Sequence, residues 1–197
     1  FMSLDPNDPD FVDDFEHSFA DLKLKGVKLG PIYANFDPTD RRLDFVYHQC
    51  ERFNLPILFH TGTTFCRFAP LKYSRPYLLD EVATRFPNLK IVMAHLGHPW
   101  EGEAIVTTRK HPNVYCDISA LFYRPWQLYN ALILAQEYKV MPKLLFGSDY
   151  PVTTPEESFS GLKSLNRMVE GTALPRVSET LLDEIIERDS LGLLGVE

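Results

Sequence analysis

The sequence predicts an α/β fold in which a parallel β-sheet is covered by helices. Short apolar segments and amphipathic segments alternate along nearly the whole chain, and strands that alternate with helices pair in parallel. The apolar segments are hydrophobic on both faces, as the strands of a parallel sheet are when helices cover it. Together these two observations favour a fold built from repeated strand–helix units.

Five apolar segments and the tail of a sixth are the predicted strands. Along the chain they read FMSLD at the start, KGVKLGP (25–31), PILFHTG (56–62), LKIVMAHLG (89–97), VYCDISA (114–120) and KLLFGSD (143–149). Three of them run into glycine or proline, which is typical of a strand that meets a loop.

Amphipathic segments with capping residues between these strands are the predicted helices. They cover residues 37–53, 74–86, 99–110, 125–138, 154–171 and 178–188. The expected caps are Asp37, followed by Pro38 and Asp40, then Ser74, then Thr154 with Pro155 and Glu157, Gly171 as a C-cap, and Ser178.

The spacing of the strand ends predicts a (β/α)₈ TIM barrel. The candidate strand ends lie 22 to 35 residues apart, and a barrel of roughly 250 residues averages about 31 residues per unit. Since only five full strands and a tail are present, we expect a partial barrel lacking the first strands, with residues 1–197 forming a single barrel domain of about strands 3–8. A doubly wound open sheet is the alternative, but no GxGxxG phosphate loop supports it.

Charge and composition exclude several classes of function. The net charge of −7 and the pI near 5.4 argue against a nucleic-acid partner, which requires a basic surface. No apolar run reaches the roughly 18 residues of a membrane span. No signal peptide is visible, and the three cysteines are scattered without CxxC spacing, so we expect a cytoplasmic protein with reduced thiols.

Polar side chains stand at the ends of four predicted strands, and these ends meet at one rim of a barrel. The residues are His60, His95, Asp117 and Asp149. Imidazoles and a carboxylate at one point form a divalent-metal ligand set, or a histidine and an aspartate form an acid–base pair. A single histidine after an apolar strand is more often a hydrogen-bonded core residue, but three polar residues at matching positions favour a joint site.

The other candidate residues have plainer interpretations. Lys28 at a strand end could be a carbamylated metal bridge, but a lysine that pairs with a carboxylate is favoured. Cys66 has no nearby base in the sequence, so packing is favoured over a nucleophilic role. Three other histidines are predicted to be structural or surface residues: His17, His48 and His111. His98 either lines the pocket or caps the next helix, and the cap is favoured.

Four segments together resemble the metal-dependent amidohydrolase-related superfamily (amidohydrolase 2). They are LPILFHTG, FPNLKIVMAHLGHPW, NVYCDISA and KLLFGSDYP, and the resemblance extends from FMSLDP to LLG. The branch it resembles contains aminocarboxymuconate semialdehyde decarboxylase and resorcylate-type decarboxylases. Four motifs in order are specific to the superfamily but not to a substrate.

The resemblance implies roles for three residues and a divalent metal, Zn²⁺ above all. His60 corresponds to a metal ligand, and Asp149 to a ligand that also handles a proton. His95 polarises substrate or water in one-metal members and binds the second metal in two-metal members. The His-x-His pair of the family's first strand has no counterpart in this chain, which agrees with the expected absence of the first strands.

The expected function is metal-dependent hydrolysis of a small organic acid, ester, lactone or amide through a metal-activated water. Non-oxidative decarboxylation at the same site is one alternative, and an inactive partial barrel that acts only in assembly is another. Asp117 lies deeper than Asp149 because its strand pattern continues, so we expect it to hydrogen-bond behind the ligands. The predicted substrate-binding residues are Arg67, Arg124 and Trp126, on the loops after His60 and Asp117. Unpaired strand edges would favour a homodimer.

Overall fold

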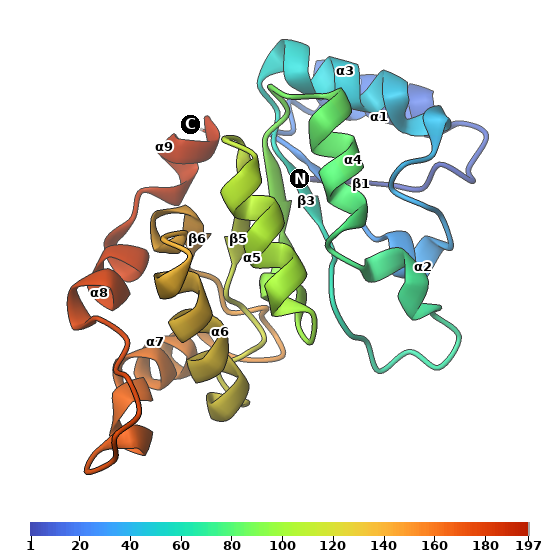
Figure 1. Ribbon diagram of the computed structural model, residues 1–197. Coiled ribbons are helices and arrows are strands. Elements are labelled where there is room, and N and C mark those ends of the chain that lie inside the picture. The colour runs from blue at the N-terminus through green and yellow to red at the C-terminus, as the bar shows by residue number, and fades with distance from the viewer. Residues whose placement is uncertain (197) are drawn as a thin grey trace.

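Six short parallel strands form one sheet in the computed structural model, which describes residues 1–196 (Figure 1). They are β1 (Met2–Leu4), β2 (Val27–Leu29), β3 (Ile57–Phe59), β4 (Ile91–Met93), β5 (Val114–Asp117) and β6 (Leu144–Leu145). In the sheet they follow one another in chain order, and every neighbouring pair is parallel. A doubly wound sheet would reverse its order at a switch point, so this order is that of a partial barrel, as predicted.

Most helices connect the strands or cover the outer face of the sheet (Figure 1), whereas the last one contributes Leu194 to a cluster on the inner face. The α-helices are α1 (Phe11–Ala20), α2 (Pro31–Ala34), α3 (Asp44–Phe53), α4 (Leu78–Arg85), α5 (Glu101–Lys110), α6 (Pro125–Glu137), α7 (Pro155–Lys163), α8 (Glu179–Glu187) and α9 (Ser190–Leu194). Five 3₁₀ turns join them, η1 (Arg41–Leu43), η2 (Leu71–Ser74), η3 (Ala94–Gly97), η4 (Met141–Lys143) and η5 (Leu165–Val169). Within residues 1–196 no helix combines the length and apolar character that crossing a membrane requires.

The register of the sheet sorts the strand residues into two faces. Ile57 and Ile91 pair across the sheet, and both are fully buried in the main core beneath the helices. The alternate residue Val92 instead joins a smaller cluster with Tyr115 and with Leu194 of α9. Successive side chains of a strand point to opposite faces, so this smaller cluster lies on the concave inner face. Burial on both faces explains why the strands read as continuous apolar runs.

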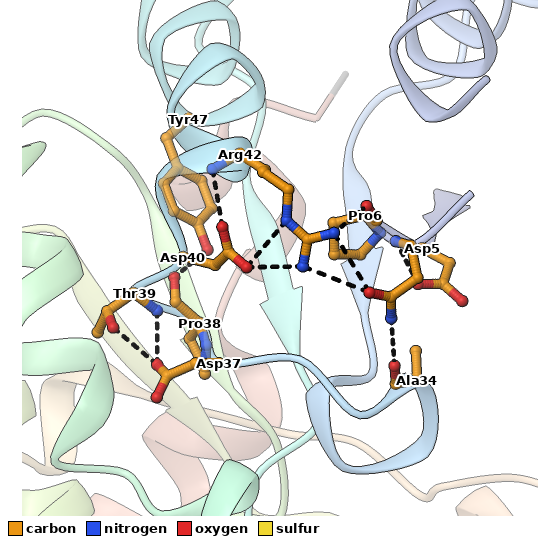
Figure 2. A network of polar contacts seen from close by, with 10 residues as sticks. Asp5, Pro6, Ala34, Asp37, Pro38, Thr39, Asp40, Arg42 and Tyr47 are labelled. Carbon is orange, nitrogen blue, oxygen red and sulfur yellow. Dashed lines mark hydrogen bonds and ion pairs between the residues drawn. The ribbon is translucent and has the colours of Figure 1, made fainter. Parts of the chain in front are cut away.

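The predicted start of the helix at Asp37 is wrong, because local hydrogen bonds hold residues 37–43 in other turns. The Asp37 carboxylate accepts hydrogen bonds from the backbone N and Oγ1 of Thr39, each at 2.8 Å. Asp40 caps η1 by accepting from the backbone N of Arg42, whose guanidinium bonds Asp40 at 2.7 Å and the Pro6 carbonyl at 2.9 Å (Figure 2). Aspartate commonly stabilises such turns in competition with the helix. Helix α3 therefore begins only at Asp44.

Two further helix boundaries differ from the predictions, while two caps are confirmed. Ser74 ends η2 and does not cap a helix, since α4 begins at Leu78. Helix α7 ends at Lys163, so Gly171 follows the separate turn η5 instead. The Thr154 capping box is present, with the Thr154 backbone N donating to Glu157 at 2.9 Å, and Ser178 caps α8.

Candidate active site

The chain brings His60, His95 and Asp149 to one cavity at the C-terminal ends of the strands. His60 follows β3 directly, His95 lies two residues after β4, and Asp149 lies four residues after β6. All three line a cavity of about 140 Å³, which we call the histidine cavity. Its full lining is Tyr33, His60, Thr63, Thr64, Phe65, His95, His98, Ala120, Tyr123, Arg124, Asp149 and Val152.

His60 is buried and neutral. Only 8% of its surface is exposed, and its backbone N donates to the Leu29 carbonyl of the neighbouring strand at 2.8 Å. Its ring lies edge-on to that of His95, with 5.1 Å between the centroids. Burial lowers the pKa of His60 to about 3, and the nearby His95 and Lys28 contribute to this lowering. A neutral imidazole is the form that binds a metal ion.

Asp117 and Ser119 hold His95 in place. The chain turns sharply at His95, where φ is 59°. The Oδ1 atom of Asp117 accepts hydrogen bonds from the backbone N of His95 at 2.9 Å, the backbone N of Ser119 at 3.0 Å and the Ser119 hydroxyl at 2.5 Å. Asp117, which the sequence places behind the ligands, thus sits at the base of the site.

The same contacts set the tautomer of His95. The Ser119 hydroxyl lies 2.8 Å from Nδ1 of His95, and it gives its own hydrogen to Asp117. Ser119 therefore accepts from Nδ1–H, which leaves Nε2 of neutral His95 as an acceptor. The sequence does not single out Ser119, because a serine two residues beyond a strand end has no distinctive pattern.

Asp149 stands on a sharp turn, as the Gly147–Ser148 sequence predicts. Its φ is 61°, and its carbonyl accepts a hydrogen bond from the backbone N of Val152 at 2.8 Å. The residue lines both the histidine cavity and the concave inner face of the sheet. The carboxylate is thus carried from the end of β6 to the rim, where the two imidazoles lie.

Lys28 of β2 faces the inner side of the sheet near two carboxylates. Burial lowers the pKa of Lys28, while the charges of Asp117 and Asp149 raise it. Lys28, Asp117 and Asp149 also line the same concavity on the inner face. This arrangement supports the simpler of the two interpretations, a lysine that balances the charge of the site's carboxylates.

The structure places one of the three predicted substrate-binding residues in the cavity. Arg124 lines it, donates from Nη1 to the Ala120 carbonyl at 2.9 Å, and lies over the Tyr123 ring at 4.4 Å. Arg67 is exposed on the loop after His60 and is not among the lining residues. Trp126 is 51% exposed and stacks on Tyr129, also outside the lining.

His111 and His17 agree with their predicted structural roles, whereas His98 lies in the cavity. His111 contacts Asp80 at 2.7 Å, and His17 contacts Asp21 at 2.8 Å on the surface. His98 Nδ1 lies 2.6 Å from the Glu101 carboxylate in the first turn of α5. His98 also lines the histidine cavity, which is the alternative position predicted for it, whereas the predicted cap is wrong because the N-cap of α5 is Trp100.

Tyr33, Phe65 and Val152 also line the cavity, although the sequence gives no reason to choose them. Tyr33 lies on α2, and its hydroxyl is 3.5 Å from Nε2 of His60. For Tyr33 alone, the Gly30–Pro31 pair could have indicated a position near the rim, because it marks a turn directly after β2. Phe65 and Val152 lie on loops, where no periodic sequence pattern indicates which way a side chain points.

The donor chemistry of the cavity fits a divalent cation in part. Imidazole nitrogen and carboxylate oxygen are the ligands that Zn²⁺ and related ions prefer, and His60, His95 and Asp149 supply them. Within residues 1–196 no three such side chains lie close enough to form a complete metal cluster. The chain therefore provides donors of the right kind without a full coordination sphere.

The three cysteines differ sharply in accessibility, which gives a testable expectation. Cys50 and Cys116 are buried, and burial raises the pKa of each thiol to about 12. Cys66 is exposed. Because the thiolate is the reactive form, we expect only Cys66 among the three to react rapidly with DTNB in the native state. A Cys66→Ser variant should lose that fast phase, and a fast phase that survives it in residues 1–197 would contradict the burial of the other two thiols.

Comparison with known proteins agrees with the fold. The sequence profile described as Amidohydrolase matches residues 1–187. No curated protein matches the chain. An uncharacterised TIM-barrel protein from Bordetella bronchiseptica has a similar structure, with 23% identity, a TM-score of 0.73, and coverage of 98% of this chain and 65% of that protein. The chain thus spans about two thirds of its structural relative.

Two similar structures contain metal ions. One is a dihydroxybenzoic acid decarboxylase from Polaromonas with bound manganese, with 14% identity, a TM-score of 0.63, and coverage of 98% of this chain and 66% of that one. The other is an amidohydrolase from Burkholderia multivorans with bound zinc, with 14% identity, a TM-score of 0.65, and coverage of 98% and 72%. At such identities these likenesses show the fold, and the profile match shows the family. The chain belongs to the amidohydrolase family and forms part of its TIM barrel.

Proposed function

We propose that this chain carries the catalytic rim of a metal-dependent hydrolase that cleaves a small organic ester, lactone or amide with water. The observation that supports this most strongly is the convergence of His60, His95 and Asp149 in one cavity. The cavity lies at the C-terminal ends of parallel strands, the face where TIM-barrel enzymes have their active sites. Family membership and metal-bearing structural relatives support the same class of chemistry.

His60 and Asp149 are the residues that would hold the cation. A bound divalent cation supplies a Lewis acid that polarises the scissile carbonyl and lowers the pKa of water toward about 7. His60 offers an unprotonated nitrogen because its pKa is about 3. Asp149 offers a carboxylate oxygen, and it lies near Lys28, whose pKa the charge of Asp149 raises.

Asp149 would transfer the proton, and His95 would orient the water that loses it. The Asp149 carboxylate takes the proton of the attacking water and returns it to the leaving group, which is general base and then general acid catalysis. With Nδ1–H bonded to Ser119, Nε2 of His95 accepts a hydrogen bond from that water and orients it. Asp117 fixes this orientation without touching the substrate.

Arg124 gives a reason to expect an acidic substrate. Its guanidinium lies at the cavity wall, held by the Ala120 carbonyl and the Tyr123 ring. A guanidinium fixed in this way suits a carboxylate, which it can bind with two parallel hydrogen bonds. A substrate carboxylate bound there would lie in the same cavity as His95 and Asp149.

The same guanidinium supports decarboxylation as a second candidate. A carboxylate held next to a Lewis acid can be lost as CO₂, and one structural relative is a dihydroxybenzoic acid decarboxylase. The two candidates predict different products from an aromatic hydroxy acid and its ester. Release of CO₂ from the acid would favour decarboxylation, whereas release of alcohol from the ester would favour hydrolysis.

Metal dependence tests both candidates. Elemental analysis of the complete protein should show about one divalent ion per chain, and removing it with a chelator should abolish turnover until Zn²⁺ or Mn²⁺ is restored. His60→Ala should lower the metal content, while His48→Ala, an exposed histidine on α3, should leave it unchanged. Undiminished turnover by the metal-free protein would refute the proposal.

A further inference from the structure

A second hollow lies beside the histidine cavity. It has a volume of about 520 Å³ and is lined by Phe65, Phe122, Tyr123, Val152, Thr153 and Glu157. We call it the apolar groove. Phe65, Tyr123 and Val152 line both hollows, so the groove and the histidine cavity meet along one shared wall.

The shared wall is apolar and open to solvent. Phe65 is 87% exposed, Val152 57% and Tyr123 43%, while Phe122 forms the buried floor of the groove. Apolar side chains exposed together beside a concave site commonly mark a surface that a ligand covers. Here the exposed side chains belong to the entrance of the candidate active site itself.

Charge is unevenly distributed along the two hollows. Arg124 lies in the histidine cavity, at the wall shared with the groove through its neighbour Tyr123. Glu157 lies in the groove and carries the one charged side chain among its six lining residues. Both Arg124 and Asp149 line the histidine cavity, so an anionic group there can pair with the guanidinium, whereas the groove offers it Glu157 and no cationic side chain.

We propose that the substrate has two parts, a carboxylate-bearing reacting head and an uncharged apolar extension that lies in the apolar groove. The proposal rests on the proposed function for the head and adds the chemical class of the remainder. Because three residues line both hollows, the two lie side by side, and one molecule can extend over the shared wall from one into the other. The extension covers Phe65 and Val152 and removes their apolar surface from water, so it contributes binding free energy.

Phe68 separates this proposal from a protein partner. It lies on the same loop as Phe65 and is 89% exposed, but it lines neither hollow. A second copy of the chain that covered this loop would contact both phenylalanines. A substrate extension in the groove would contact Phe65 alone. Both side chains are almost fully exposed, so replacing either should not impair folding.

The experiment measures binding of three carboxylates to the complete protein by isothermal titration calorimetry. Benzoate represents the head alone, 4-butylbenzoate adds an apolar extension, and 4-(3-carboxypropyl)benzoate ends a similar extension in a charge. Each buried CH₂ contributes about 0.8 kcal/mol, so half burial of the butyl group predicts about tenfold tighter binding than benzoate. The charged extension should bind more weakly than the butyl one.

Matched variants test which side chains cause the preference for 4-butylbenzoate. Phe65→Ser should remove most of the preference for 4-butylbenzoate over benzoate, and Phe68→Ser should leave it unchanged. Glu157→Gln should improve binding of the charged extension by about two- to fivefold, the range for an exposed charge pair. Glutamine at this position keeps the Thr154 capping box, so α7 should be preserved.

The outcomes separate the extension from the reaction. A tenfold preference that depends on Phe65 but not on Phe68 supports the extension, even if no ester or acid is turned over, a result that would count against the proposed function alone. Equal affinity for benzoate and 4-butylbenzoate, or equal losses in the two phenylalanine variants, would overturn the extension. Failure of all three carboxylates to bind would also overturn it.

Discussion

Replacing Asp149 with asparagine is expected to reduce the turnover of the complete protein by more than about 10²–10⁴-fold. General acid–base catalysis alone accounts for about that range, and the substitution also removes an anionic ligand from the site. Asparagine keeps the size of the side chain and can keep the turn, since asparagine tolerates positive φ and Asp149 has φ of 61°. The loss should therefore appear in kcat and in metal content, while the melting temperature stays close to that of the parent.

Asp117→Asn is the matched control, because it changes a neighbouring carboxylate that has a different role. The Oδ1 atom of asparagine can still accept hydrogen bonds from the backbone N of His95 and from Ser119. Changes behind the metal ligands typically cost about 10–100-fold, so this variant should keep measurable turnover and its bound metal. Both variants should be compared by kcat/KM and by elemental analysis. The opposite order of activity would show that the catalytic aspartate has been misassigned.

The sequence predicts the rim residues because their positions follow from the strand pattern. His60, His95, Asp117 and Asp149 each lie at or shortly after the end of an apolar strand, and parallel strands bring such positions to one edge. Loop residues have no such rule. The sequence therefore selects Arg67, which lies outside the cavity lining, and misses Phe65 and Val152, which line it; Trp126 also lies outside the lining, because it belongs to the first turn of α6.

Helix boundaries are likewise predicted correctly where a local capping pattern decides them, and wrongly where other hydrogen bonds compete with the cap. The Thr154 capping box predicts the start of α7 correctly, because its two reciprocal hydrogen bonds involve residues that are three positions apart. Asp37 offers the same local pattern, but its carboxylate bonds Thr39 and its neighbour Asp40 binds Arg42 (Figure 2). Arg42 in turn reaches Pro6, 36 residues away, and such a distant contact cannot be read from the local sequence.

A single methyl group at Gly62 is expected to destabilise the fold and impair the site together. Gly62 has φ of 88°, where residues with a Cβ are strained by about 1–2 kcal/mol. A Cβ there would overlap the His98 carbonyl oxygen and lie 3.1 Å from the Gly97 carbonyl carbon, both rigid backbone atoms. Overpacking of this kind adds typically about 1–3 kcal/mol. Gly62→Ala should therefore lower the free energy of unfolding by about 3 kcal/mol.

The functional part of this expectation comes from the two loops that meet at Gly62. Its backbone N donates to the Ser74 carbonyl at 2.9 Å, and the next residue, Thr63, donates to the His98 carbonyl at 2.7 Å. His60 and His98 lie on the two sides of this junction and both line the cavity. Pushing the loops apart should move His60 and reduce metal binding as well as stability.

Gly102 provides the control, because the same substitution there should act in the opposite direction. It lies in α5, where no atom comes within 4 Å of the position that an alanine methyl group would take, and alanine in a helix is favoured over glycine by about 0.5–1 kcal/mol. Urea unfolding of both variants of the complete protein, with metal content measured alongside, makes the comparison. If Gly62→Ala unfolds at the same urea concentration as Gly102→Ala, the close approach of the His60 and His98 loops does not exist in solution.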